Sequence, residues 1–349
     1  MRSSLLALTL CLVACAPTLT SSSFGTTNTA SSPEMAAAMA NAQQMAAMGQ
    51  AARSAAEAGC APLQSRQPGF EEERTIGQML STHLVASQGH LYLDGAAQKD
   101  PAKLTEEILS GKAQTLPEGG KNAVSAHVAI VGKNLTRFSA RPDVPWVFAV
   151  IENDTPNALS TAGGYVFVTT GLLKKTTNEA QLAGVLAHEI GHVVRKHSLA
   201  KYVDARHKQC VAAKYAAYLI EHGTRGGPAV DEMARFARNF DDPDAADAGF
   251  ARFILQALMM LQQFGNDREA EFETDKTALE LVSFAGYDPT EYEKFLTSLG
   301  EEKNGLTGQH PQTADRVAKL KAQREGELKD FAHGTAKPDL GKVFAPLSK

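Results

Sequence analysis

The chain has 349 residues, of which 43% are hydrophobic and 21% charged, and it carries a formal net charge of -4. This length allows one sizeable core with additional segments, or two modest domains. Because the net charge is slightly negative and no run of lysine or arginine exceeds a pair, the composition argues against nucleic acid as a main partner.

The first residues have the layout of a secretory signal. Arg2 precedes the apolar run 5–13, which is too short for a permanent membrane helix, and small residues lead to Cys15. The ending LVAC resembles a bacterial lipobox, which implies that residues 1–14 are removed and that Cys15 carries a lipid. The protein is then expected in the cell envelope, at the outer membrane facing the periplasm. An ordinary signal peptide with a fortuitous cysteine is the alternative.

Residues 15–32 are rich in serine and threonine and predict a tether. An alanine- and methionine-rich helix with a linker is expected over 33–68, with Ser32 as N-cap, Pro33 at the first helical position and Gly59 as the stop. Packing against the rest of the protein is the expected role of its methionines, and a partner-binding stripe is the alternative. These methionines are Met35, Met39, Met45 and Met48.

The main domain is expected over 69–332, beginning with an amphipathic helix at FEEERTIGQMLSTHLV. A loop at GGKNAVS precedes another helical run through Phe138. Two strands are predicted, near 145–153 and 165–170, with a glycine turn between them and a hairpin as one possible pairing.

The second half of the chain is expected to be mostly helical. Residues 201–264 are interrupted by HGTRGGPAV and FDDPDAADAG, and this insert is expected either to cover the active site as a lid or to provide extra packing. The tail 333–349 is predicted to be irregular. Cys60 and Cys210 can pair in an exported protein, but sequence alone leaves this open.

The segment AGVLAHEIGHVV carries the candidate metal site. Thr176 is the predicted N-cap of its helix, with Glu179 completing a capping box. His188 and His192 are four residues apart, so both imidazoles can reach one ion at about 2.0 to 2.1 Å. Glu189 between them can act on a metal-bound water. This is the zinc-hydrolase pattern H-E-x-x-H.

A catalytic zinc needs a third protein ligand and one open position. The extended pattern H-E-x-x-H-x-x-G-x-x-H fails, because Arg195 replaces the glycine and His197 falls one residue short. His197 is therefore expected at the surface. Glu271 and Asp275 are four apart on a second predicted helix, where one can bind zinc and the other can hold a ligand histidine.

These motifs resemble the zinc metallopeptidase family of the CAAX prenyl protease and HtpX, and its exported bacterial lipoprotein branch similar to LoiP and BepA. The resemblance spans about residues 70–325 and rests on EERTIGQ, VFAVIENDTPNALSTAGGYVFVTTGLL, HEIGH, REAEFETD with AGYDP, and HPQTADRV, in that order. It implies Glu271 as third zinc ligand and Asp275 as its outer partner. It also implies that His310 and Arg316 stabilise the transition state, or that the histidine caps the metal in a resting form.

Two departures from the family pattern concern local geometry only. Thr274 stands where the family usually has alanine, and Ala162 stands where it has proline before the double glycine. Neither position supplies a ligand or the base.

The resemblance implies an α+β, mainly helical, zincin-like gluzincin fold, with a small sheet packed on the HEIGH helix and one Zn²⁺ per chain. The implied activity is hydrolysis of peptide bonds in unfolded or misassembled envelope proteins, with Glu189 as general base. The envelope assembly machinery is a possible partner, and a non-catalytic zinc-containing assembly factor or chaperone is the competing reading. Substrate is expected to pair with 165–170 as an edge strand. The substrate-binding residues are then Asn157, Gly164, Tyr165, Val166 and Phe167.

Overall fold

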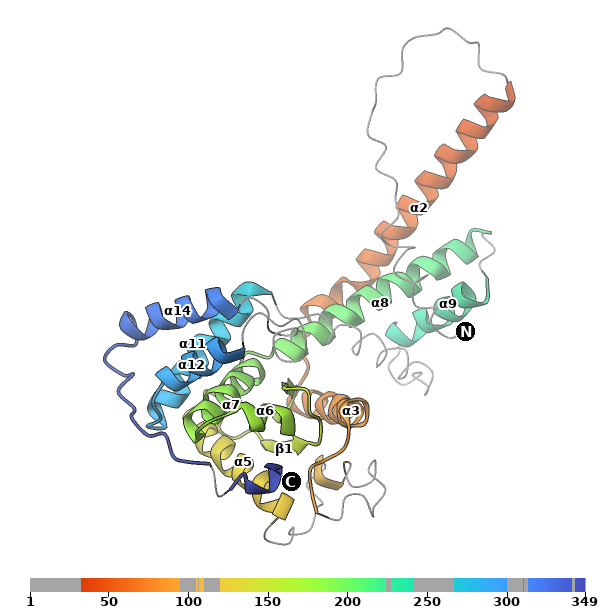
Figure 1. The fold of residues 1–349 in the computed structure, drawn as a ribbon. Coiled ribbons are helices and arrows are strands. Elements are labelled where there is room, and N and C mark those ends of the chain that lie inside the picture. Colours follow the sequence, from red (N-terminus) through yellow and green to blue (C-terminus); the bar gives the residue numbers. More distant parts are fainter. Residues whose placement is uncertain are drawn as a thin grey trace. The chain divides into compact units, whose positions relative to one another are not determined.

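A computed structural model describes residues 33–94, 105, 107–109, 120–223, 227–241, 267–299, 310, 313–340 and 343–348 (Figure 1). The predicted signal peptide and tether lie outside these described residues, as does most of the predicted break at FDDPDAADAG. The chain divides into two compact units, Met1–Gln67 with Val203–Ala257, and Pro68–Tyr202 with Leu258–Lys349.

The second unit holds the sheet and most of the named helices. The strands are β1 (Val147–Ile151), β2 (Ala158–Thr161) and β3 (Tyr165–Thr169). The helices are α3 (Phe70–Gln88), α5 (Gly120–Thr136), α6 (Thr170–Lys175), α7 (Glu179–Val194), α11 (Arg268–Phe284), α12 (Thr290–Leu299), α14 (Thr313–Glu325) and the 3₁₀ helix η3 (Ala345–Ser348). The described residues therefore form a mainly helical α+β fold with a small sheet, as predicted.

The sheet has the order β1-β3-β2, with β3 parallel to β1 and antiparallel to β2. The hairpin joins β2 to β3 through Gly163 and Gly164, whose φ angles of 75° and 95° suit glycine. The predicted strand near 145–153 is correct in place, but its pairing with β3 is parallel. The four-residue strand β2 was missed because ALST is too short to show a clear alternation of apolar and polar residues.

The prediction that 165–170 is an edge strand is wrong. Strand β3 is central, so its main chain already pairs with β1 on one side and β2 on the other. Gly164 accepts a hydrogen bond from the Val147 N–H, and the Asn157 side chain accepts one from Ala158. Pairing of a substrate with the main chain of β3 is therefore excluded, and the substrate-binding role of the predicted positions stays a prediction. The affected residues are Asn157, Gly164, Tyr165, Val166 and Phe167.

Both faces of the sheet are covered, which explains why β3 reads as a continuous apolar run. One face contributes side chains to the core around α7, and the other packs with α3 in a second cluster. Helix α3 approaches the β2–β3 turn so closely that a Cβ on Gly77 would lie 1.8 Å from the Ala162 carbonyl oxygen. This close contact fixes the position of the hairpin against α3.

Helix α7 is the central helix of this unit and packs against α5, α11, α12 and the sheet (Figure 1). It begins at Glu179, because the Asn178 side chain is the N-cap and accepts a hydrogen bond from the Gln181 N–H. The prediction of Thr176 as N-cap is wrong. Thr176 instead ends α6 and donates its hydroxyl to the Leu173 carbonyl. Helix α5 begins at Gly120, so the predicted loop at GGKNAVS is mostly helical.

The first unit contains α2 (Pro33–Ser65), α9 (Pro228–Asp241) and the part of α8 (His197–Glu221) from Val203 onward. Cys60 and Cys210 form a disulfide in its buried apolar cluster. Helix α2 continues six residues past Gly59, so the predicted stop is wrong. Glycine lowers helix stability by only about 1 kcal/mol, and the disulfide and core packing at Cys60 hold this turn in place.

The methionines of α2 do not pack as expected. Met39 and Met45 are 61% and 59% exposed, while Met48 is half-buried. The side chain of Met35 lies outside the described ones. The surrounding residues are mostly alanine and polar, so this part of α2 has no apolar face wide enough to form a core.

The break predicted at HGTRGGPAV is confirmed, because α8 ends at Glu221 and α9 begins at Pro228. The lid role of the insert stays a prediction. Residues 333–340 are irregular as predicted, apart from one bridge between Ala336 and Tyr287, and η3 follows. Among the described helices, none combines the length and the hydropathy that a membrane span requires.

Candidate active site

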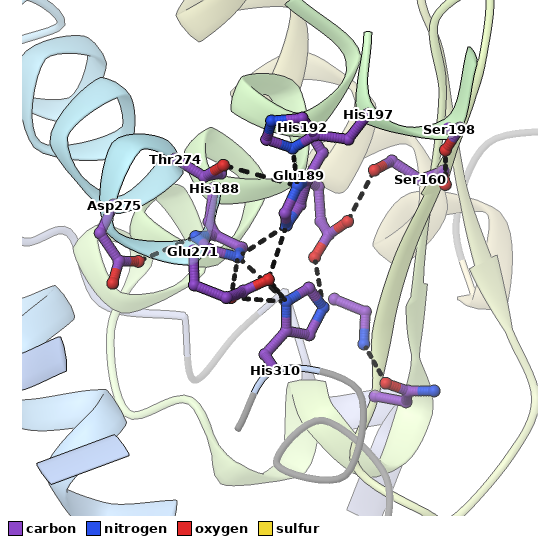
Figure 2. Close-up of polar contacts among 12 residues, drawn as sticks. Ser160, His188, Glu189, His192, His197, Ser198, Glu271, Thr274, Asp275 and His310 are labelled. Atoms are coloured by element: carbon purple, nitrogen blue, oxygen red, sulfur yellow. Dashed lines mark hydrogen bonds and ion pairs between the residues drawn. The ribbon is translucent and has the colours of Figure 1, made fainter. Parts of the chain in front are cut away.

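Helices α7 and α11 and the loop residue His310 bring most of the predicted metal-site residues together (Figure 2), and α14 adds Arg316. Helix α11 begins at Arg268 because the Asp267 side chain caps it by accepting from the Ala270 N–H. This start sets two carboxylates one turn apart, facing α7. All members of the group are buried: His188, Glu189 and His192 from α7, Glu271 and Asp275 from α11, Arg316 from α14, and His310.

Four side chains point their donor atoms at one small volume. His188 Nε2 lies 3.0 Å from His192 Nε2 and 3.2 Å from His310 Nδ1. Glu271 closes the group, with oxygens 3.3 Å from His188 Nε2, 3.5 Å from His192 Nε2 and 3.0 Å from His310 Nδ1. For a tetrahedral ion with bonds of about 2.0 to 2.1 Å, the ligand atoms stand about 3.3 Å apart. The measured separations fit that arrangement.

The chemistry of these donors also fits a cation. His188 Nδ1 faces Asp275, so in the neutral ring the proton is favoured on Nδ1 and Nε2 has a lone pair for a metal. Two further ring nitrogens and a Glu271 oxygen lie within 3.3 Å of this Nε2. Burial raises the pKa of Glu271, but the charge of His310 and the hydrogen bond from His188 outweigh it and lower the pKa well below its ordinary value. The buried carboxylate is compensated here by the histidines around it, and a cation bound between the same groups would supply that positive charge instead.

A charged network holds His188 through Nδ1, the ring nitrogen that faces away from the donor cluster. Asp275 Oδ1 lies 2.9 Å from its Nδ1, and Arg316 forms two hydrogen bonds of 2.6 and 2.8 Å with the same carboxylate. The Tyr292 hydroxyl donates to Asp275 at 3.0 Å. Burial favours the neutral acid, but Arg316 lowers the pKa of Asp275 to about 2. Burial likewise opposes the charge of His188, yet hydrogen bonds with Asp275 and Glu271 raise its pKa to about 9.

His192 has a different neighbour. Its Nδ1 lies 2.7 Å from His197 Nδ1 and 3.5 Å from Thr274 Oγ1 (Figure 2). The prediction that His197 lies at the surface is therefore wrong: it is half-buried and contacts a candidate metal ligand. Burial and the neighbouring His188 lower the pKa of His192 well below its ordinary value, which keeps the imidazole neutral as metal binding requires.

Glu189 lies beside the donor cluster, with a carboxylate oxygen within 4.8 Å of ring nitrogens of the three histidines, so it can act at the same ion. Its Oε2 accepts a hydrogen bond of 2.8 Å from the Ser160 hydroxyl on β2 (Figure 2). Its Oε1 is buried, has no hydrogen-bond partner among the described residues, and lies 3.5 Å from His310 Nε2. One carboxylate oxygen is thus held while the other is free for chemistry. No motif in the sequence indicates a role for Ser160, because β2 itself is too short to be predicted.

Strand β2 is the sheet edge nearest this cluster. Its Thr161 and Leu159 sit opposite Tyr165 and Phe167 of β3. The Asn157 carbonyl, just before β2, accepts a hydrogen bond from the Thr169 N–H of β3. In an antiparallel pair, residues whose main chain bonds to the neighbouring strand alternate with residues whose main chain points away from it. Ser160, three residues after Asn157, is therefore of the second kind, and its N–H and C=O point away from β3. Consistent with this, the Ser160 carbonyl accepts a long hydrogen bond of 3.4 Å from the Ser198 hydroxyl.

A buried helix with two histidines and a free glutamate oxygen, completed by a carboxylate from a second helix, defines a metallohydrolase type of site. Comparison with known proteins agrees. The chain belongs to peptidase family M48, whose family model matches residues 122–324. This match confirms the resemblance to the zinc metallopeptidases and includes every candidate ligand and the base.

Three relatives illustrate the range of the family. The mitochondrial metalloendopeptidase OMA1 of Schizosaccharomyces pombe is 30% identical over 60% of this chain and 57% of its own length. The beta-barrel assembly-enhancing protease of Yersinia pestis is 27% identical over 51% of this chain and 33% of its length. Protease HtpX of Legionella pneumophila is 29% identical over 51% and 70%. The chain thus spans little more than half of the first relative and a third of the second.

Proposed function

We propose that this protein is a zinc-dependent endopeptidase of the bacterial cell envelope, with one Zn²⁺ held by His188, His192 and Glu271. The observation that carries the proposal is the free Oε1 of Glu189 beside a cluster of donors spaced for a tetrahedral ion. Membership of family M48 supports zinc as the metal, as do two imidazoles and one carboxylate. When bound, zinc lowers the pKa of a water and polarises the scissile carbonyl.

Glu189 is the general base in this proposal. Its Oε2 is fixed by Ser160, so Oε1 is the oxygen that takes a proton from water and returns it to the leaving amine. Because both oxygens are almost fully buried, the carboxylate exchanges its proton with the reacting groups rather than with bulk solvent. The position of Glu189 next to His188 on α7 keeps it beside the ligand cluster without occupying a ligand position.

His310 fills the fourth corner of the donor set in this structure. Its Nδ1 is 3.2 Å from His188 Nε2 and 3.0 Å from Glu271, while a catalytic zinc site keeps one position for water or substrate. We therefore assign His310 to a closed resting form, from which it must withdraw before substrate binds. Its Nε2 is then available to stabilise the oxyanion.

Arg316 is proposed to act through other side chains. Its guanidinium is bound to Asp275 at 2.6 and 2.8 Å and lies 3.4 Å from Glu271, so its contacts support a positioning role. The direct role in stabilising the oxyanion stays a prediction. Substrate is proposed to pair with the outward main chain of β2, in place of the central strand, because β2 is the edge beside Glu189.

Polypeptides are the proposed substrate class, with unfolded or misassembled envelope proteins as natural targets. The relative named a beta-barrel assembly-enhancing protease supports a link to envelope assembly. The LVAC sequence supports removal of residues 1–14 and a lipid on Cys15, which would hold the protein at the outer membrane, facing the periplasm. The disulfide between Cys60 and Cys210 suits an oxidising compartment of this kind.

The competing reading, a non-catalytic zinc-containing factor, has no support from the comparisons or the site. Closed structural zinc sites are commonly completed by cysteine, whereas Cys60 and Cys210 are joined to each other in the first unit. In a purely structural zinc site, the Glu189 oxygen that lacks a hydrogen-bond partner would also have no chemical role.

Glu189→Gln tests the proposal directly in the full-length chain. We expect one zinc per chain by elemental analysis in wild type and variant alike, with casein cleavage reduced at least roughly 10²-fold in the variant. Glu273→Gln is the matched control, because Glu273 lies on α11 but is exposed and paired with Arg195. Cleavage by Glu189→Gln at the wild-type rate would overturn the role of the base, and absence of zinc from the wild type would overturn the metal site.

A further inference from the structure

We propose that His197 is the positioning residue that orients His192 for metal binding. The inference rests on the proposed function, because it assigns a partner to one of the proposed zinc ligands. It concerns a histidine outside H-E-x-x-H and its extended form, since its spacing of five residues from His192 matches neither pattern.

The two nitrogens of His192 face different surroundings. Nε2 points into the donor cluster, 3.0 Å from His188 Nε2 and 3.5 Å from Glu271. Nδ1 points the opposite way and meets His197 Nδ1 at 2.7 Å. A neutral imidazole carries one proton, so Nε2 has a lone pair for the metal only when that proton is on Nδ1. An acceptor beside Nδ1 selects that tautomer, and His197 Nδ1 supplies it.

The alternative partner, Thr274, is less suited to this task. Its hydroxyl oxygen lies 3.5 Å from His192 Nδ1, at the outer limit of a hydrogen bond. Its hydroxyl donates its proton to the Ala270 carbonyl at 2.7 Å, so the oxygen can still accept, and the long distance from His192 Nδ1 is what makes it the weaker acceptor. His197 is therefore the nearer of these two described partners.

The backbone adopts a rare conformation to bring His197 to this place. Five residues along an unbroken helix correspond to about 500°, so His197 would point roughly 140° away from His192. Helix α7 instead ends at Val194, and Lys196 takes a φ of 59° as the single described non-glycine residue with a positive value. The next residue begins α8 and lies beside His192. Non-glycine residues in this left-handed region cost of order 1 kcal/mol or more.

The contact predicts a difference between two matched amide variants. Asparagine places its Oδ1 where the histidine has Nδ1, so His197→Asn keeps an acceptor for His192. Glutamine carries its oxygen one bond further out, so His197→Gln removes the acceptor at that place while remaining polar. His197→Ala removes it altogether. His222→Ala is the control, because His222 is an exposed histidine in the turn that follows α8.

The experiment measures the zinc dissociation constant of each full-length protein by competition with a chelator, together with the melting temperature of the zinc-free form. We expect zinc affinity to fall 10- to 100-fold in His197→Ala and His197→Gln. His197→Asn and His222→Ala should stay within threefold of wild type. In the zinc-free state, the melting temperatures of the variants and of the wild type should agree closely. His197 is only half-buried, and its proposed role is to orient His192 for zinc binding.

The outcomes separate this inference from the proposed function. A wild type without zinc would overturn the proposed function itself. A wild type that binds zinc, with His197→Gln equal to it in affinity, would overturn the inference alone. If His197→Ala does not fold, the asparagine and glutamine variants are compared with each other instead. Equal zinc affinities of those two variants would also overturn the inference.

Discussion

The two candidate ligand histidines lie one turn apart on α7, yet they are held by different chemistry. His188 is held by Asp275, which Arg316 and Tyr292 bind in turn, so its surroundings are a buried charged network from α11, α12 and α14. His192 is held by His197, a half-buried neutral partner five residues along the chain. Positioning of the first ligand is therefore tied to the stability of the core, whereas positioning of the second depends on one local turn.

The largest effect is expected from Asp275→Ala. Removing this carboxylate leaves Arg316 buried without its partner, and breaking a buried pair in this way costs about 3 to 5 kcal/mol of unfolding free energy. Zinc affinity should fall 10- to 100-fold as well, because His188 loses its outer hydrogen bond. Thermal or denaturant unfolding of the zinc-free protein and chelator competition measure the two effects.

Asp315→Ala is the matched control for that experiment. It removes an acidic residue that pairs with Arg268 at the surface, where both side chains are more than half exposed. Exposed pairs contribute about 0 to 1 kcal/mol, so this variant should remain close to wild type. If Asp275→Ala were no less stable than His197→Ala in the zinc-free state, the proposed contrast between the two histidines would be wrong.

Ser160→Ala is expected to have an intermediate effect, on turnover alone. Its hydroxyl holds Oε2 of Glu189 at 2.8 Å, and loss of a hydrogen bond to a charged group should lower kcat roughly tenfold, or about 1.4 kcal/mol. KM and zinc affinity should stay unchanged, because Ser160 contacts none of the proposed ligands in the described structure. Peptide cleavage kinetics and chelator competition separate these quantities.

Ser160→Thr provides the rescue variant. Threonine keeps the hydroxyl and suits a strand, so kcat should return to within about threefold of wild type. An increase of KM at constant kcat in Ser160→Ala would instead assign this residue to substrate binding along β2. That result would leave Glu189 without a residue that fixes its orientation.

The sequence predicted the parts of the site that repeat at helical spacing. His188, Glu189 and His192 share one helix, and Glu271 and Asp275 share another; their relative positions follow from residues per turn. The prediction that α11 packs against α7 rests on the family resemblance, because the spacing of residues within one helix does not indicate which helices pack together. The mainly helical fold with a small sheet was predicted on the same grounds.

The parts that were missed depend on contacts between segments. Strand β2 is four residues long, and only its pairing with β3 makes it a strand. Its absence from the prediction made β3 an edge strand and concealed Ser160. The prediction that His197 lies at the surface rests on the spacing of a known motif, whereas its actual position depends on the backbone turn at Lys196. A positive φ at a lysine cannot be recognised from the sequence.

The smallest predicted effect concerns that turn, and it tests whether the local support of His192 depends on backbone conformation. Lys196 is exposed and has a φ of 59°, so Lys196→Gly removes the strain of a side chain in the left-handed region. Glycine also increases the entropy of the unfolded chain, so the net gain in unfolding free energy should be about 0.5 to 1 kcal/mol. Lys196→Val should lose stability, because a branched side chain tolerates this conformation poorly. Zinc affinity should be unchanged in Lys196→Gly, since His197 keeps its place. Thermal unfolding of the zinc-free protein measures the difference, and a less stable glycine variant with weaker zinc binding would show that the lysine side chain, rather than the backbone, maintains the turn.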